Sequence, residues 1–189
     1  MTGGANPVGP AVEDRVLQIL REQFQPLFAI LDAARDPDIL KLLIESKAEY
    51  HSLYEGASAG QLAHFAPYLV RLCIESPLLE ALVRKGWSKS WAVYVSSAKP
   101  FRELRQHFRQ FLVVRTEERR EFYFRFYDPR VLRALLPTCM PSEIGQLFGP
   151  VRCYVMEDQN PEILLQFTIG IRGLEKALVE LSPEGPTCE

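Results

Sequence analysis

The sequence contains no long apolar run and no secretory leader. Its uninterrupted apolar stretches are only a few residues long, whereas a membrane-spanning helix needs about 20 apolar residues. Residues 1–10 are rich in glycine and proline and contain no lysine or arginine, whereas a secretory signal begins with a basic segment followed by an apolar one. We therefore expect a cytoplasmic protein that does not enter the membrane.

Paired cysteines are also missing. The four cysteines are scattered, form no C-x-x-C motif and have no histidine at metal-ligand spacing. Cys73, Cys139 and Cys153 have apolar neighbours, where cysteine usually acts as a small buried hydrophobic residue. The sequence therefore predicts neither a disulfide framework nor a zinc site.

Motifs that would indicate an enzyme are absent as well. We find no G-x-S-x-G elbow, no phosphate-binding G-x-x-x-x-G-K-[ST] loop and no G-x-G-x-x-G fingerprint. His51, His64 and His107 are far apart in the sequence. Asp32 or Asp128, each at a strand end, could serve a hydrolase-like enzyme, but neither has a second acid, histidine or metal ligand at a defined spacing. The sequence favours a protein without catalytic activity, cofactor or metal.

The overall composition is that of one ordinary soluble domain. The chain has 189 residues, of which 47% are hydrophobic and 24% charged, and this length is sufficient for a substantial core. The net charge of −2 provides no strong field toward nucleic acid or anionic membranes.

Helix and strand patterns alternate along the chain. Apolar residues recur at helical spacing in 11–24, and the continuous apolar run Leu27–Leu31 is typical of a strand buried on both faces. Asp36-Pro37, Ser76-Pro77 and Asp128-Pro129 are typical helix starts, and Gly86 is expected to end a helix in a left-handed turn. The helices are expected at about 11–24, 37–45, 77–85, 101–111, 129–136 and 142–148, and the strands at about 27–31, 67–72, 91–95, 111–114, 122–127, 151–156 and 164–169.

Strands alternate with helices early in the chain and pair as hairpins late, and the strands at 151–156 and 164–169 are expected to be the last. This order predicts a single compact domain of the α/β or α+β class, with a mixed β-sheet flanked by helices. We expect the domain to cover residues 11–181, between a flexible N-terminus at 1–10 and a flexible tail at 182–189.

One stretch, Arg102–Arg133, is rich in arginine and aromatic residues. It contains nine arginines, at 102, 105, 109, 115, 119, 120, 125, 130 and 133. Five acidic residues in the same stretch offset part of this charge. Strand alternation places Phe122, Phe124 and Phe126 on a core face and Tyr123, Arg125 and Tyr127 on the other. A nucleic-acid-binding module therefore remains an alternative.

The segment Tyr123–Leu132, with the sequence YFRFYDPRVL, resembles the signature of the type VI secretion effector-adaptor family, catalogued as domain of unknown function 4123. Further pieces of this family's pattern follow in the same order over roughly 28–157. They are Phe28–Arg35, Pro67–Val70, Gly86-Trp87 with Trp91, Leu104–Arg109 and Leu147–Val151.

The chain departs from the family pattern in two places. Ser88 replaces the glycine that often follows the first tryptophan, and the helical second lobe of many members has no counterpart after Ile171. We therefore expect a short form of the fold that lacks a helical C-terminal lobe.

The resemblance implies an adaptor chaperone that stays in the cytoplasm and needs no cofactor. Its partners would be a cognate secreted effector, a toxin, and the spike protein of the type VI secretion apparatus. Side chains of the types that dominate protein interfaces occur within the matching motifs at Trp87, Trp91, Tyr123, Arg125, Tyr127 and Arg130. The other signature residues are expected to be structural: Asp128, Pro129, Phe148, Gly149 and Pro150.

Overall fold

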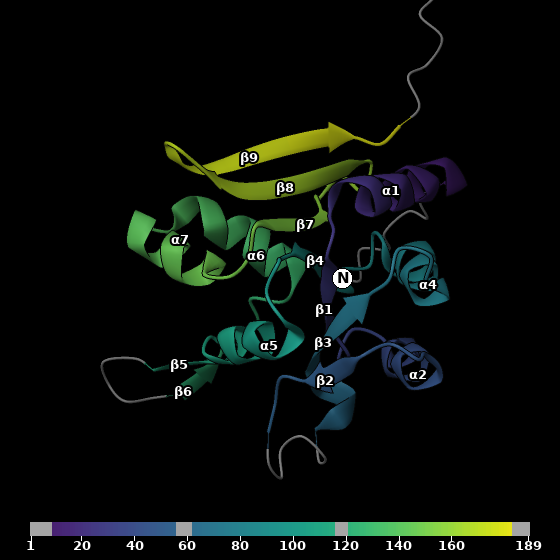
Figure 1. The fold of residues 1–189 in the computed structure, drawn as a ribbon, viewed down its shortest axis with the longest axis horizontal. Helices are drawn as coiled ribbons and strands as arrows, with labels where there is room; N and C mark the ends of the chain where they lie inside the picture. The colour runs from purple at the N-terminus through teal and green to yellow at the C-terminus, as the bar shows by residue number, and fades with distance from the viewer. Residues whose placement is uncertain (1–8, 56–61, 116–120, 183–189) are drawn as a thin grey trace, which may run out of the picture.

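A seven-stranded sheet forms the centre of the protein (Figure 1). The structure is a computed structural model that describes residues 9–55, 62–115 and 121–182. The helices are α1 (Pro10–Gln23), α2 (Pro37–Glu45), α4 (Pro77–Gly86), α5 (Phe101–Arg109), α6 (Pro129–Leu135) and α7 (Pro141–Phe148), with short 3-10 turns η1 (Ala63–Phe65) and η2 (Leu136–Thr138). The strands are β1 (Leu27–Asp32), β2 (Tyr50–Ser52), β3 (Pro67–Leu72), β4 (Ala92–Ser96), β5 (Val113–Arg115), β6 (Glu121–Tyr123), β7 (Cys153–Glu157), β8 (Ile163–Gly170) and β9 (Gly173–Glu180).

The strand order in the sheet is β2-β3-β1-β4-β7-β8-β9. The predicted fold class, a single compact domain of helices and one sheet, is confirmed. The pairing is antiparallel throughout this sheet, which corrects the expectation of mixed pairing. The physical reason lies in β1: β3 and β4 run in the same direction, as their connecting helix α4 suggested, but β1 lies between them and pairs antiparallel with both.

Helices cover both faces of the sheet. Helices α1, α2 and α4 lie on one side and α5, α6 and α7 on the other (Figure 1). All six residues of β1 are buried. Leu27, Ala29 and Leu31 enter the core beneath the first set of helices, and Phe28 and Ile30 enter the core beneath the second. The prediction of a strand buried on both faces is confirmed.

Three helices begin at the predicted caps. The carboxylate of Asp36, the hydroxyl of Ser76 and the carboxylate of Asp128 each accept a hydrogen bond from the backbone amide two residues later, at 2.9, 3.1 and 3.0 Å. A proline occupies the first helical position after each cap, where the missing amide hydrogen costs nothing.

Gly86 has a different role from the one expected. It is the last residue of α4 and does not have a positive φ, so the expectation of a left-handed turn there is wrong. A Cβ atom at this position would lie 2.7 Å from Cε3 of Trp91. Glycine is therefore needed because the Trp91 ring packs directly against the helix backbone.

The predicted strand Phe122–Tyr127 is shorter than expected. Strand β6 ends at Tyr123 and pairs only with β5, in a separate two-stranded sheet. The chain then turns toward α6, with the amide of Asp128 donating to the carbonyl of Arg125 at 3.0 Å. Phe126 and Tyr127 are both buried in this turn, so the predicted placement of Tyr127 on an outer face is wrong. Residues 117–120, which would form the turn of a hairpin between the strands predicted at 111–114 and 122–127, lie outside the described residues.

Two strands of the main sheet were not predicted. Strand β2 has only three residues, too few for a periodic pattern. Strand β9 follows β8 through the two-residue turn Ile171-Arg172, so β8 is not the last strand. The glutamates and lysine of β9 interrupt its apolar alternation, and the flanking glycines Gly170 and Gly173 were its available signal. The predicted termini fall almost wholly outside the described residues, although Pro10 already belongs to α1.

Candidate functional site

Three buried carboxylates lie near the carboxyl ends of strands β1 and β7. Asp32 ends β1, Glu157 ends β7 and Asp128 precedes α6, and their residues are 0%, 5% and 2% exposed. Strands β1 and β7 are both antiparallel to β4, so their carboxyl ends meet where the loop Trp87–Trp91 leads into β4. Buried carboxylates require donors, and each of these has them within the chain.

Asp32 is paired with Arg125 of the signature segment. The Arg125 guanidinium donates to Oδ2 of Asp32, and the amide of Ala34 donates to Oδ1 at 3.2 Å. The Arg125 side chain remains 42% exposed, whereas that of Asp32 is fully buried. This ion pair joins the signature segment to the end of β1.

Asp128 binds Arg130 in addition to capping α6. Nε and Nη2 of Arg130 donate to the two carboxylate oxygens at 3.0 and 2.6 Å. Burial acts to raise the pKa of Asp128, but the hydrogen bonds from the Arg130 side chain and backbone outweigh it, and the pKa lies below its ordinary value. The carboxylate therefore stays ionised and fixes the direction of the Arg130 side chain.

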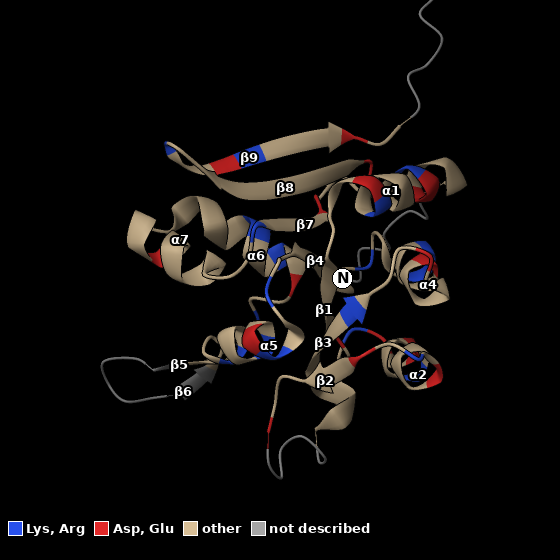
Figure 2. Cartoon of the chain, viewed as in Figure 1, with Lys and Arg blue, Asp and Glu red and all other residues tan. Residues whose placement is uncertain are grey.

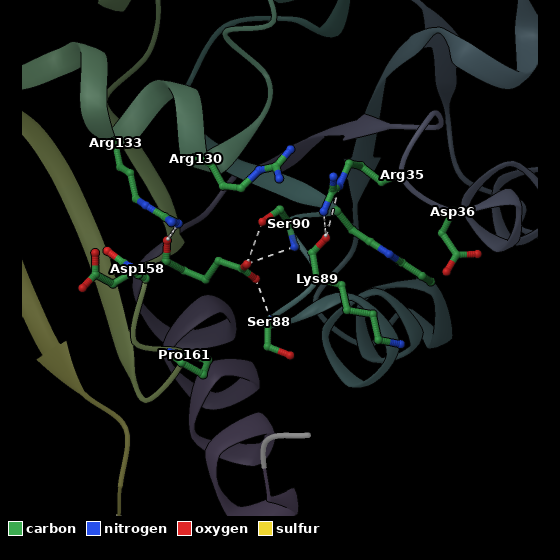
Figure 3. A pocket seen from close by; sticks show the side chains of 12 residues that line it. Arg35, Asp36, Ser88, Lys89, Ser90, Arg130, Arg133, Asp158 and Pro161 are labelled. Carbon is green, nitrogen blue, oxygen red and sulfur yellow. Dashed lines mark hydrogen bonds between the residues drawn. The ribbon is translucent and has the colours of Figure 1, made fainter. Parts of the chain in front are cut away.

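Glu157 is held by the loop Trp87–Trp91, of which Figure 3 labels Ser88, Lys89 and Ser90. Its oxygens accept from the Ser88 amide at 2.6 Å, the Ser90 amide at 2.9 Å and the Ser90 hydroxyl at 3.1 Å. Burial, the largest effect, raises the pKa of Glu157, and these hydrogen bonds offset only part of the increase.

Both serines of this loop have a left-handed backbone, with φ of 71° at Ser88 and 59° at Ser90. Glycine adopts this conformation without a steric cost, whereas other residues are strained in it. Ser88 stands where the family pattern often has glycine, and it keeps the backbone conformation that a glycine would adopt. In this conformation the backbone amides of Ser88 and Ser90 both donate to the carboxylate of Glu157.

A pocket of about 600 Å³ opens above these contacts (Figure 3). Basic side chains reach it from three segments: Arg35 from the turn after β1, Lys89 from the loop, and Arg130 and Arg133 from α6. Nζ of Lys89 lies 5.5 Å from the centre of the Trp91 ring. The pocket is further lined by Asp36, Ser88, Ser90, Trp91, Glu157, Asp158, Gln159 and Pro161.

The carboxylates at and beside the pocket are engaged within the chain, whereas its rim carries exposed cationic side chains. The oxygens of Glu157 and Asp128 already accept hydrogen bonds from the chain itself. The exposed rim residues Arg35, Lys89 and Arg130 present cationic groups to a ligand.

The six predicted interface residues lie around these strand ends, but at different depths. Tyr123 is 65% exposed, and the side chains of Arg125 and Arg130 are 42% and 48% exposed. The others are buried: Trp87, Trp91 and Tyr127. Nε1 of Trp87 donates to the carbonyl of Pro161 at 2.8 Å, which ties the loop to the segment after β7. We call the exposed set Tyr123, Arg125 and Arg130, with Arg35 and Lys89, the signature face.

Tyr54 contacts both the exposed Tyr123 and the buried Tyr127, and it was not predicted as a site residue. Its ring centre lies 5.7 Å from that of Tyr123, and its hydroxyl is hydrogen-bonded with that of Tyr127. Burial is the largest of the effects that raise the pKa of Tyr127 above its ordinary value. No sequence signal could have found Tyr54, since it lies in a loop far from the signature. Arg35, Lys89 and Glu157 were missed for the same reason.

The signature residues expected to be structural each have a packing partner or constraint. Pro129 is buried, and the Phe148 ring packs against Tyr154 with 5.0 Å between ring centres. Gly149 has a φ of 44°, and a Cβ there would lie 2.6 Å from the His107 ring. The Pro150 carbonyl accepts from the Ser97 hydroxyl at 2.7 Å.

Among the arginines of the 102–133 stretch whose side chains the structure describes, most make contacts within the protein. Arg105 and Arg109 both pair with Glu55, and they also donate to the carbonyls of Ser52 and Leu53. Arg133 donates to the Glu157 carbonyl at 3.2 Å. The remaining described arginine of this helix face, at position 102, is exposed. Figure 2 shows acidic and basic segments side by side on α1, α4 and α5, so the described cations of these helices are interspersed with acidic residues.

Other kinds of site find no support in the described part of the chain. There, no three histidine, cysteine or acidic side chains are placed to hold a metal ion, and no helix is long and apolar enough to cross a bilayer. His107 is half-buried, with Nε2 3.0 Å from the Leu147 carbonyl. Cys73 is exposed because it follows the end of β3, contrary to expectation, whereas Cys153 is buried.

One comparison with known proteins gave a match. The family model described as "Domain of unknown function (DUF4123)" matches residues 27–146, from the start of β1 into α7. No curated protein and no solved structure matches the chain.

Proposed function

The chain belongs to the DUF4123 family, and from this premise we propose that it is an adaptor chaperone of type VI secretion. In this proposal it binds a cognate secreted toxin in the cytoplasm and helps to load the toxin onto the spike protein of the secretion apparatus. The proposal rests on the resemblance of Tyr123–Leu132 to the signature of effector adaptors. The chain acts by binding and catalyses no reaction.

The observation that carries the proposal is the signature face. The segment with the resemblance presents Tyr123, Arg125 and Arg130 at the surface, and Arg130 also lines the pocket that holds Lys89. Tyrosine and arginine are enriched among residues that dominate protein interfaces, since they combine contact area with directed hydrogen bonds. Two of these arginines are fixed by buried carboxylates, so a partner would meet preorganised side chains.

The same contacts argue against the enzyme alternative. Asp32 and Asp128 were the candidate catalytic carboxylates, and both are engaged by arginines and backbone amides. A general base needs a lone pair directed at its substrate. Holding the signature segment in place accounts for both carboxylates.

Co-purification tests the proposal. We would express the tagged chain together with a candidate toxin encoded beside it and with the spike protein, and analyse the eluate by size exclusion with light scattering. We expect a stoichiometric complex with the toxin, and more intact toxin in cells that contain the chain. Lys89→Glu should reduce toxin recovery, whereas Lys41→Glu, an exposed position on α2, should leave it unchanged.

A chain that elutes alone while another adaptor from the same cell retains the toxin would overturn the cargo assignment. The nucleic-acid alternative would then be tested by its salt dependence, because neutralised phosphates release counterions and make binding steeply sensitive to salt.

A further inference from the structure

Strand β9 forms one edge of the sheet, and among the described residues one of its two sides has no strand paired with it. It is the last strand in the sheet order and pairs only with β8. It is eight residues long, and most of its side chains are exposed. Figure 1 shows it at the outer margin of the fold. Long open edges invite pairing with another strand, since their amides and carbonyls have no partner in the sheet.

The hydrogen-bonding direction of each β9 residue follows from its pairing with β8. The amide of Leu181, just beyond β9, donates to the carbonyl of Glu162 at 2.8 Å, so odd-numbered residues here direct their backbone groups at β8. These directions alternate along an antiparallel strand. The outward backbone groups are therefore those of the even-numbered residues Leu174, Lys176, Leu178 and Glu180.

We propose that β9 pairs antiparallel with β9 of a second copy of this chain, about a twofold axis at Leu178. In this register Leu178 faces the partner's Leu178. Lys176 faces the partner's Glu180, and Glu180 faces the partner's Lys176. The ion pair between Lys176 and Glu180 therefore occurs twice in the dimer. The interface is self-complementary, as a twofold contact requires.

The charges of β9 select this register over its neighbours. An axis at Lys176 would place the two lysines opposite each other, and an axis at Glu180 would do the same with the two glutamates. Like charges directly opposite in a sheet are destabilising. An axis at Ala177 or Val179 would set a charged residue opposite Leu178. Only the axis at Leu178 matches lysine with glutamate.

The exposed apolar side chain at the axis gains most from the contact. Leu178 is 58% exposed and lies beside Leu165 of β8, which is buried. Lys176 is already oriented on this side of the sheet, with Nζ 5.9 Å from the centre of the Phe167 ring. Two Leu178 side chains would extend the apolar face of one sheet into the next.

The contact is small, so the dimer should be weak. Three pairs of outward residues give about six backbone hydrogen bonds, and the area is below the roughly 800 Å² per partner of a standard interface. A dissociation constant on the order of micromolar is expected. This contact involves only the chain itself, so it does not rest on the proposed function.

Sedimentation equilibrium of the purified full chain tests the inference. We expect a monomer–dimer equilibrium for the wild type. Lys176→Glu and Glu180→Lys should each weaken dimerisation by about tenfold or more, because each change places like charges opposite each other twice. The double variant K176E/E180K should restore the dimer, since the pairs are only exchanged. Arg172→Glu, in the exposed turn before β9, is the matched charge-reversal control and should leave the dimer unchanged.

A wild-type chain that stays monomeric up to roughly 100-fold above the expected micromolar constant would overturn the proposal. So would a dimer that both single reversals leave intact, or a double variant that is folded but monomeric. Far-UV circular dichroism of every variant establishes that the fold is kept.

Discussion

At the scale of single residues, the site is organised by carboxylates that are buried and satisfied. Asp32 holds Arg125, Asp128 holds Arg130, and Glu157 holds the loop at Ser88 and Ser90. An unsatisfied buried polar group costs about twice the net gain of a single hydrogen bond. Removing one partner from any of these contacts should therefore cost stability as well as binding.

Asp32→Asn should destabilise the fold. The change leaves the Arg125 guanidinium without its carboxylate and places an amide in a fully buried position. Because Arg125 is partly exposed, water can replace some of the lost contact, and we expect the free energy of unfolding to fall by about 1–3 kcal/mol. Urea denaturation measures it. Asp158→Asn, at the pocket rim, should change it by less than about 0.5 kcal/mol.

Glu157 and Asp128 should contribute to stability with opposite pH dependence. The pKa of Glu157 is raised above its ordinary 4.5, so the folded state retains this proton more strongly than the unfolded chain. That contribution is present below the unfolded pKa and is lost as the pH rises through the folded pKa. The pKa of Asp128 is lowered from 3.8, so its contribution is present above the unfolded pKa and is lost as the pH falls through the folded one.

The measurement is the free energy of unfolding of the wild type minus that of Glu157→Gln, as a function of pH. This difference should decrease as the pH rises above about 4. The same difference for Asp128→Asn should decrease on acidification. Two differences that change in the same direction would contradict the assignment.

At the scale of elements, the loop Trp87–Trp91 depends on close packing against the end of α4. Gly86→Ala should lower the free energy of unfolding by about 1–3 kcal/mol, because the new methyl group would overlap the Trp91 ring. Gly145→Ala in α7 has nothing within 4 Å of the new Cβ and should instead stabilise by up to about 1 kcal/mol, since alanine is the better helix former. Thermal and urea unfolding of the two variants provide the comparison.

The left-handed backbone of the same loop gives a second test. At Ser88 the glycine variant should be more stable than the alanine variant by about 1 kcal/mol, because only glycine adopts a positive φ without strain. At Lys89, whose φ is not positive, the order should be reversed. Equal stability of Ser88→Gly and Ser88→Ala would contradict the strained conformation.

Local patterns predicted the elements that carry a strong local signal. The apolar run of β1 and the caps at Asp36, Ser76 and Asp128 were predictable because each depends on neighbouring residues. The strand order was not, because the insertion of β1 between β3 and β4 is decided by packing between distant segments. Strand β9 was missed because its charges mask the alternation, and those charges are what makes its edge self-complementary.

The candidate site was predicted only in part, for the same reason. The signature residues Tyr123, Arg125 and Arg130 could be named because they are contiguous in the sequence. Arg35, Lys89 and Glu157 come from separate segments, and only the fold brings them to one pocket. The buried positions of Trp87, Trp91 and Tyr127 follow from packing around Gly86 and Tyr54, which residue type alone does not indicate.

At the scale of the whole molecule, two separate surfaces are available to partners. The signature face lies where β1 and β7 end beside α6, and the open edge of β9 belongs to the last strand of the sheet. Self-association through β9 therefore leaves Tyr123 and Lys89 accessible to cargo. A Lys176→Glu monomer should bind the toxin with the affinity of the wild type, as a titration at fixed toxin concentration would show.

The measurement that tests the central claim most directly is a calorimetric titration of the purified toxin with the purified chain. We predict saturable binding that Tyr123→Ala and Lys89→Glu each weaken by about tenfold. This factor corresponds to the loss of one interface contact worth about 1.4 kcal/mol. The control variant Lys41→Glu should bind like the wild type. Absence of binding by the folded wild-type chain to the toxin encoded beside it, or binding that is equal in all four proteins, would contradict an adaptor that holds its cargo at the signature face.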